Sequence, residues 1–227
     1  DIPAITAVTG PRNILTVLDD TWSAGVFFRA FDHGVDVTIQ ALTKYQAGHA
    51  DVLAGAVIAR TRPLAEKIRK TRKEIGHGLS PDDAFLVLRG MRTMHARLAL
   101  HDTACRRIAA WMETRPEVAR VIHPALPSHP DHALWQRDFT GAAGIFSAVL
   151  HPVSDEAVAR MMEGYSHIGL GFSWGGFESL VIPCDEQLRR PATGWSEPGP
   201  LLRYQIGLEA PDDLIADLEA GFGRLRE

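Results

Sequence analysis

The sequence predicts an α/β fold for the first half of the chain and a smaller α+β region for the second half. Two apolar segments, residues 14–18 and 35–39, flank a segment with helical spacing of its phenylalanines. Strand, helix and strand in this order favour a parallel sheet. From about residue 114, short strands and helices mix without that order. The 227 residues, 45% of them hydrophobic, are enough to bury a core in one or two domains.

The first half is expected to contain three strands and one short helix. Residues 14–18, Ile-Leu-Thr-Val-Leu, are strongly apolar, which predicts a fully buried strand. Residues 26–33 are predicted to be a short helix that ends at Gly34. Residues 35–39 and 52–59 are predicted to be the next two strands.

Helices are expected to follow these strands. Residues 63–73 predict a basic helix with a solvated charged side. Ser80 and Pro81 suit the cap and first position of another helix, and Gly90 is expected to interrupt it. Residues 91–112 then predict one long helix, with Met94, Leu98, Cys105 and Ile108 on its inner side.

The second half predicts an α+β region with its helices on one face of a mainly antiparallel sheet. A proline-rich loop follows its first strand. The expected strands are residues 118–124, 144–150, 180–182 and 201–206, and the expected helices are residues 155–163 and 211–226.

Charge and cysteine content exclude several classes of function. The net charge is −4, from 24 basic and 28 acidic side chains, so no basic excess points to nucleic acid, and no long apolar run predicts a membrane span. Cys105 and Cys184 match no metal spacing and fit a reducing cytoplasm. The histidines of the proline-rich loop lack a carboxylate or Cys at ligand spacing, so no metal site is predicted; they are His123, His129 and His132.

Two residues at predicted strand ends suggest a cofactor. Asp19 closes the strand at residues 14–18, and Lys44 follows the next strand, 25 positions later. Pyridoxal phosphate (PLP) chemistry requires this pair: the Lys amine forms the Schiff base, and the carboxylate keeps the pyridine nitrogen protonated. Taken singly, an Asp here is common in turns and a Lys is common on surfaces, so the pair needs support from the surrounding sequence.

Arg203 is a candidate binding residue for an anion. Its neighbours Leu202, Ile206 and Leu208 favour burial, and a buried guanidinium needs an anionic partner. Its planar fork of donors matches a carboxylate. The alternative is a strand arginine that is paired on the surface.

Four motifs resemble the Cys/Met-metabolism family of PLP enzymes. Two of them are residues 19–22, Asp-Asp-Thr-Trp, and residues 43–51, which contain Thr-Lys-Tyr and Gly-His-Ala-Asp. Residues 171–179 resemble the family's Ser-x-Gly-Gly-x-Glu-Ser segment, and residues 202–209 resemble the segment with the substrate-carboxylate arginine. The Trp after Ser173 is most similar to the bacterial cystathionine β-lyase branch.

The resemblance implies a fold-type-I, aspartate-aminotransferase-like architecture. Residues 1–113 would be the C-terminal part of the PLP-binding large domain, and residues 114–227 the small domain. It also implies a role for individual residues. Asp19, Thr43 and Lys44 would bind PLP, with Lys44 catalytic and the Thr43 hydroxyl on the phosphate, while Arg203, Ser173 and Trp174 would bind the substrate. Many family members carry a Ser at the position of Ala41.

The reaction implied is cleavage of L-cystathionine to homocysteine, pyruvate and ammonia, as a step of methionine biosynthesis by transsulfuration. The enzyme would be a cytoplasmic homotetramer built from catalytic dimers. The alternatives are cystathionine γ-synthase, cystathionine γ-lyase and O-acyl-homoserine sulfhydrylase reactions, which share these residues. A catalytically silent structural fragment is a further alternative, because the resemblance implies that an upstream part of the large domain is absent and that this chain alone is incomplete.

Overall fold

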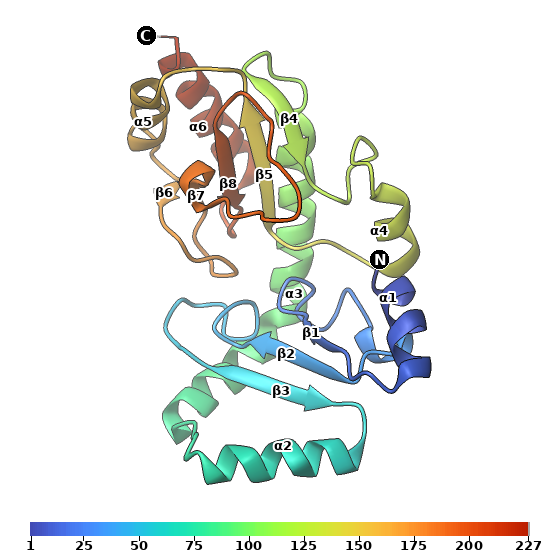
Figure 1. The fold of residues 1–227 in the computed structure, drawn as a ribbon. Coiled ribbons are helices and arrows are strands. Elements are labelled where there is room, and N and C mark those ends of the chain that lie inside the picture. Colours follow the sequence, from blue (N-terminus) through green and yellow to red (C-terminus); the bar gives the residue numbers. More distant parts are fainter. Residues whose placement is uncertain (227) are drawn as a thin grey trace. The chain divides into compact units, whose positions relative to one another are not determined.

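The computed structural model describes residues 1–226, which form two compact units (Figure 1). The first unit contains residues 1–96 and 133–141, and the second contains residues 97–132 and the chain from residue 142 onward. These units are defined by contacts within this chain and do not test a domain boundary of the whole protein. The predicted boundary between residues 113 and 114 therefore stays a prediction. No helix in residues 1–226 has the length and apolar character that a membrane crossing requires.

A three-stranded sheet forms the centre of the first unit, in the order β1-β2-β3. Strand β1 (Val17–Asp19) runs parallel to β2 (Val37–Ala41), with Asp19 opposite Ile39, so the predicted parallel pairing is confirmed. Strand β3 (Gly55–Ala59) pairs with β2 in the antiparallel direction.

The prediction of a fully buried strand at residues 14–18 is wrong. The strand begins only at Val17, and Ile14, Leu15 and Val17 are 53%, 58% and 55% exposed. Strand β1 is at the edge of this sheet, and Val17, together with Leu15 just before the strand, lines a groove of about 1040 Å³. A strand is buried on both faces only when other elements cover it, and the described residues do not cover this one.

The segment between β1 and β2 is also less regular than predicted. Only the 3₁₀ turn η2 (Ala30–His33) replaces the helix expected at residues 26–33. The phenylalanines do not share one helical face, because Phe28 is buried and stacks on Phe139 with ring centroids 4.8 Å apart. Gly34 ends the turn in the left-handed region, at φ 83°, as predicted.

Helices α2 (Arg62–Glu74) and α3 (Pro81–Met112) confirm the predicted helices. The Ser80 hydroxyl accepts a hydrogen bond from the Asp83 amide at 3.0 Å, as expected of a cap. Gly90 does not interrupt α3, however. It lies inside the helix, where a Cβ would come within 2.2 Å of the Ala47 carbonyl oxygen. The glycine permits a close contact between backbones, which sequence spacing does not distinguish from a helix stop. Two further helices, α1 (Ile2–Thr9) and α4 (His132–Asp138), complete the first unit.

The second unit contains a five-stranded sheet in the order β4-β5-β8-β7-β6. Its pairs are antiparallel except β6 with β7, which is parallel. The strands are β4 (Val118–Ile122), β5 (Ile145–Leu150), β6 (Gly169–Leu170), β7 (Leu180–Pro183) and β8 (Leu201–Gln205).

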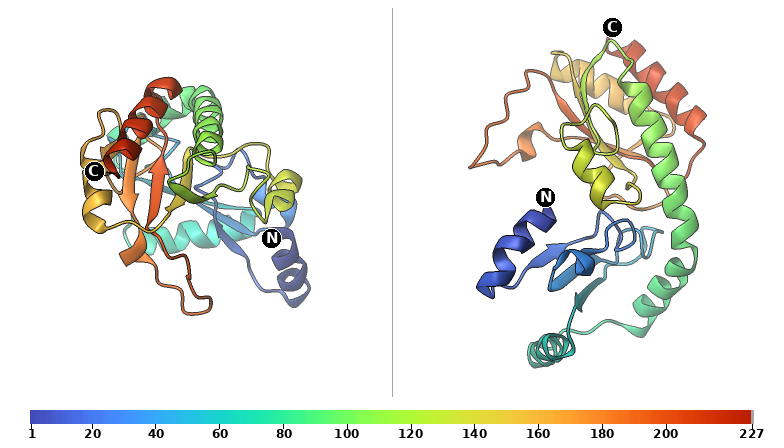
Figure 2. Two further views of the ribbon diagram at one scale, coloured as in Figure 1. Left: turned by 90° about the horizontal axis from the view of Figure 1, so that it is seen from above. Right: turned by 90° about the vertical axis from the view of Figure 1, so that its right-hand side faces the viewer.

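One face of this sheet packs on helices, as predicted. Helices α5 (Asp155–Glu163) and α6 (Pro211–Arg224) join the second half of α3 behind the sheet (Figure 2). The buried core between them contains Ile108, Met112, Phe146, Ala148, Leu150, Met161, Leu202, Tyr204, Leu218 and Phe222. Because side chains alternate along a strand, Arg203 lies on the other face, beside Ser147 and Ile182.

We expect Gly90→Ala to destabilise the protein by about 1–3 kcal/mol, because the added methyl group would meet the carbonyl oxygens of Gln46 and Ala47. Gly223→Ala, inside α6, is the matched control: its Cβ would meet nothing within 4 Å. There we expect a gain of roughly 0.5–1 kcal/mol from helix propensity. Urea unfolding of the full-length protein measures both, and equal effects at the two glycines would contradict the close-contact interpretation.

Candidate active site

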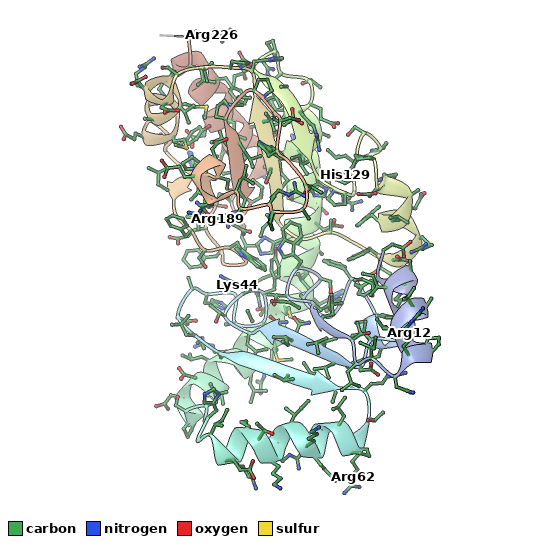
Figure 3. All side chains as sticks on the ribbon, in the orientation of Figure 1. Arg12, Lys44, Arg62, His129, Arg189 and Arg226 are labelled. Carbon is green, nitrogen blue, oxygen red and sulfur yellow. The ribbon has the colours of Figure 1, made fainter. Side chains whose placement is uncertain are left out.

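Lys44 lies in a tight turn that follows strand β2 (Figure 3). The Lys44 amide donates to the Ala41 carbonyl at 3.0 Å, and the Gly48 amide donates to the Lys44 carbonyl at 2.7 Å. Tyr45 is fully buried and anchors the turn, whereas Lys44 is half-buried. The turn therefore holds the backbone of Lys44 at the carboxyl end of β2.

Asp19 ends strand β1 at the same edge of the sheet. Because β1 and β2 are parallel, the carboxyl ends of both strands meet there, the usual position of ligands in open α/β sheets. The Asp19 Oδ1 atom accepts hydrogen bonds from the Thr21 amide at 3.1 Å and from the Thr21 hydroxyl at 2.6 Å. Within residues 1–226, no hydrogen bond to Oδ2 is found. The structure thus brings Asp19 and the Lys44 turn to one edge and leaves one carboxylate oxygen open.

A buried polar network connects the turn after Asp19 to the strand before Lys44. The Ser23 hydroxyl donates to Asp20 Oδ1 at 2.5 Å, and the Gln40 amide donates to the Asp20 carbonyl at 3.1 Å. Gln46 then donates to Gln40 Oε1 at 3.0 Å and to the Ala24 carbonyl at 3.2 Å. Asp20 is only 6% exposed, and burial raises the pKa of its carboxyl group to about 6. The network fixes the turn after Asp19 relative to the strand before Lys44. Burial of the Asp20 carboxyl group in this network lowers the stability of the fold.

The Thr43 hydroxyl holds the Lys44 turn against the segment before β3. It accepts from the Ala54 amide at 3.0 Å and donates to the Ala54 carbonyl at 3.2 Å. A hydroxyl has a single proton. The predicted contact with a cofactor phosphate stays a prediction, and it requires the proton to turn away from the Ala54 carbonyl.

Arg203 lies on the sheet face opposite the helices of the second unit. Its Nη2 atom donates to the carbonyl oxygens of Phe172 and Ser173, the latter at 3.3 Å. Its Nε atom is buried without a hydrogen-bond partner in the described structure. Burial lowers the pKa of the Arg203 guanidinium. A buried donor of this kind fits an anionic ligand that the chain itself does not provide.

The Gly-rich segment around Ser173 is braced by Glu209, which the sequence analysis did not single out. Glu209 Oε1 accepts from the Ser179 amide and Oε2 from the Ser179 hydroxyl, both at 2.7 Å. The same hydroxyl accepts from the Gly207 amide at 2.9 Å. Both residues belong to the quoted motifs, but only the structure shows that the two motifs bond to each other.

Ser173 is exposed and Trp174 is half-buried in this segment. The candidate residues therefore form two groups, one in each unit: Asp19, Thr43 and Lys44 in the first, and Arg203, Ser173 and Trp174 in the second.

The histidines of the proline-rich loop are engaged within the chain. Nδ1 of His123 accepts from the Ala125 amide at 3.1 Å, and burial lowers the pKa of His123 to about 4. His132 Nδ1 lies 3.1 Å from the Pro124 carbonyl oxygen. Among the described residues, no three His, Cys, Asp or Glu side chains are arranged to hold a metal ion.

The fold and the paired strand ends define a protein of the PLP-dependent, fold-type-I class. The sequence model of the Cys/Met metabolism PLP-dependent enzymes matches residues 1–223, and the chain belongs to that family.

The proteins that this chain resembles are named for different reactions. The putative cystathionine β-lyase of Rhizobium johnstonii is 46% identical over 98% of this chain and 57% of its own length, and the cystathionine β-lyase of Salmonella typhimurium is 44% identical over 99% and 58%. The L-alanine/L-glutamate racemase of Wolbachia pipientis wMel is 37% identical over 99% and 56%. A crystal structure of cystathionine γ-synthase from Xanthomonas oryzae pv. oryzae, in complex with cystathionine, has a TM-score of 0.93 at 34% identity and covers 100% of this chain and 59% of that one. The chain thus spans less than two thirds of the length of these proteins.

We expect Asp20→Asn to stabilise the protein at pH 8 by roughly 1–3 kcal/mol. The folded pKa is raised, so the stability that protonation of Asp20 contributes is complete below about pH 4 and is lost as the pH rises through about 6. The advantage of the amide should therefore shrink toward pH 4. Thermal unfolding between pH 4 and 8 measures it, with Asp51→Asn, an exposed residue of the next loop, as the control. An advantage that grows toward low pH would contradict the assignment.

Proposed function

We propose that the protein of which this chain forms part is a PLP-dependent carbon–sulfur β-lyase that cleaves L-cystathionine to homocysteine, pyruvate and ammonia. The observation that carries the proposal is the meeting of Asp19 and the Lys44 turn at the carboxyl edge of β1 and β2. Identities of 46% and 44% to proteins named as cystathionine β-lyases support the β-lyase reaction over its family alternatives.

The residues of the first unit fit the cofactor. When bound, PLP supplies an aldehyde that joins an amine and a protonated ring that withdraws electrons from the substrate Cα. The open Oδ2 atom of Asp19 would hold the ring N–H, and Lys44 Nζ would join the aldehyde. Lys44 Nζ, once displaced by the substrate amine, would take the Cα proton and return a proton to the leaving sulfur. Thr43 would hold the phosphate.

The residues of the second unit fit the substrate. The buried Nε atom of Arg203 would bind one oxygen of the α-carboxylate. Nη2 would bind the other oxygen in a two-pronged contact, for which it would give up a bond to the Phe172 or Ser173 carbonyl. Ser173 and Trp174 would line the same carboxylate site. Fixing the carboxylate holds the Cα–H bond in the orientation that Lys44 requires. Cytoplasmic location and a homotetramer of catalytic dimers belong to the same proposal and rest on the family resemblance.

Other reactions of the same residues are separated by their products. Pyruvate from L-cystathionine indicates β-elimination, whereas 2-oxobutyrate indicates γ-elimination. The γ-synthase and sulfhydrylase alternatives form a new carbon–sulfur bond from an activated homoserine. D-alanine from L-alanine would favour the reaction named for the Wolbachia relative. A protein that binds no PLP would support the silent structural fragment.

We expect PLP to be joined to Lys44 in the full-length protein. Borohydride reduction followed by peptide mapping should place the pyridoxyl group on that residue, because its turn lies at the strand edge that carries Asp19. Lysines of α2 are internal controls, since they lie on a different element. A pyridoxyl group on Lys67, Lys70 or Lys73 would refute the assignment.

We expect Arg203→Lys to lower kcat/KM for L-cystathionine by about 30-fold or more, which corresponds to roughly 2–5 kcal/mol for a buried charged contact. A lysine cannot make the paired contact with a carboxylate. Cofactor content should stay normal. Arg120→Lys is the matched control, because Arg120 forms an exposed ion pair with Glu197 at 2.7 Å. An unchanged kcat/KM in Arg203→Lys would remove this residue from the site.

A further inference from the structure

Thr21 is a buried residue that contacts both Asp19 and strand β2. It is only 3% exposed, and its hydroxyl bonds to two groups, the Asp19 carboxylate and the Ala41 amide. We propose that Thr21 is a positioning residue, which fixes the Asp19 carboxylate for the cofactor ring and couples it to the strand that leads to Lys44. The inference rests on the function proposed above.

The direction of the Thr21 hydroxyl proton follows from its neighbours. The Ala41 amide donates to Thr21 Oγ1 at 2.9 Å, and a backbone N–H can only donate. The hydroxyl has one proton of its own, and its other close partner is Asp19 Oδ1 at 2.6 Å. The proton therefore points at the carboxylate, in a short, charge-assisted hydrogen bond.

This bond determines which carboxylate oxygen faces a ligand. Asp19 Oδ1 receives two donors, the amide and the hydroxyl of Thr21, and these two bonds fix the plane and rotation of the carboxylate. Oδ2 accepts no hydrogen bond from the described residues and is left for a donor outside the chain. A protonated ring nitrogen is such a donor. Asp19 itself is exposed, so without these bonds its side chain would sample several rotamers.

The same hydroxyl connects Asp19 to the Lys44 turn. The Ala41 peptide unit donates its N–H to Thr21, and the Ala41 carbonyl accepts from the Lys44 amide at 3.0 Å. Hydrogen bonds and the Ala41 backbone thus connect four residues, from Asp19 through Thr21 and Ala41 to Lys44. The two groups that would act on opposite ends of the same cofactor ring are held in one frame.

A purely structural role would give a different result from a positioning role. The polar network of Asp20, Ser23, Gln40 and Gln46 ties the same turn to β2 independently of Thr21, so variants at Thr21 are expected to fold. Loss of one buried hydroxyl should lower stability modestly wherever it occurs. Only a hydroxyl that positions Asp19 should also change the spectrum and the affinity of the bound cofactor.

The experiment compares Thr21→Ser, Thr21→Ala and Thr21→Val in the full-length protein. Ser and Ala differ only in the hydroxyl, and Thr16→Val is the matched control, because Thr16 bonds to the Thr9 hydroxyl at 2.9 Å and not to Asp19. The readouts are the PLP dissociation constant and the pH midpoint of the visible absorption of the bound cofactor. Thermal unfolding of the cofactor-free proteins measures the structural effect separately.

We expect Thr21→Ala and Thr21→Val to weaken PLP binding by about tenfold, the effect of a lost charge-assisted bond of roughly 1.4 kcal/mol. The pH midpoint should move upward, because a less firmly held positive charge on the ring raises the proton affinity of the nitrogen of Lys44. Thr21→Ser should stay within about twofold of the parent in affinity, and Thr16→Val should change neither readout.

The inference would be overturned if Thr21→Ala had the same PLP affinity and the same pH midpoint as Thr21→Ser. It would also be overturned if Thr16→Val changed both readouts as strongly as Thr21→Ala does. If the Val variant does not fold, the Ser and Ala pair still decides. Failure of the proposed function has a separate result: the parent protein would then carry no reducible pyridoxyl group on Lys44, whatever the Thr21 variants do.

Discussion

The parallel pairing of β1 with β2 is the constraint on which the candidate cofactor site depends. It brings the ends of two strands to one edge, with Asp19 opposite Ile39 and the Lys44 turn three residues beyond Ala41. Successive side chains of a strand point to opposite faces, so a register shift of one residue would turn Asp19 away. Side-chain hydrogen bonds from the turn after β1 help to hold this register. The backbone pairing of three short strands alone would hold it less firmly.

The Lys44 turn is held from more than one direction. Gln46 bonds to the turn after β1, Thr43 bonds to Ala54, and the backbone of α3 meets the carbonyl oxygens of residues 46 and 47 at Gly90. Some of these contacts cost stability: Asp20 is a buried acid, and Ala24 has a φ of 57°, which is unfavourable for a residue other than glycine. Strain of this kind persists where the surrounding contacts determine the geometry, and here it lies in the turn that follows Asp19.

How far the sequence predicts the structure depends on the range of the interactions. Helix α5 has the predicted bounds of residues 155–163, because a Ser154 cap and a following Gly164 are local features. The exposure of residues 14–18 could not be predicted, since burial depends on which other elements cover a strand. The lost helix at residues 26–33 reflects the packing of Phe28 on Phe139, more than 100 positions away. The pairing of Ser179 with Glu209 is likewise a contact between motifs, and no spacing rule contains it.

The two groups of candidate residues share one physical feature. In each, the hydrogen bonds of the described residues occupy one polar atom of a charged side chain and leave another without such a bond. Asp19 Oδ1 is occupied by Thr21, and Oδ2 is not. Arg203 Nη2 is occupied by backbone carbonyls, while Nε is buried without a partner in residues 1–226. A flexible charged side chain on the surface would satisfy itself with water at little cost. An oriented charge with one atom that has no partner in residues 1–226 instead favours a ligand of opposite charge and defined direction, as proposed for a ring N–H at Asp19 and a carboxylate at Arg203.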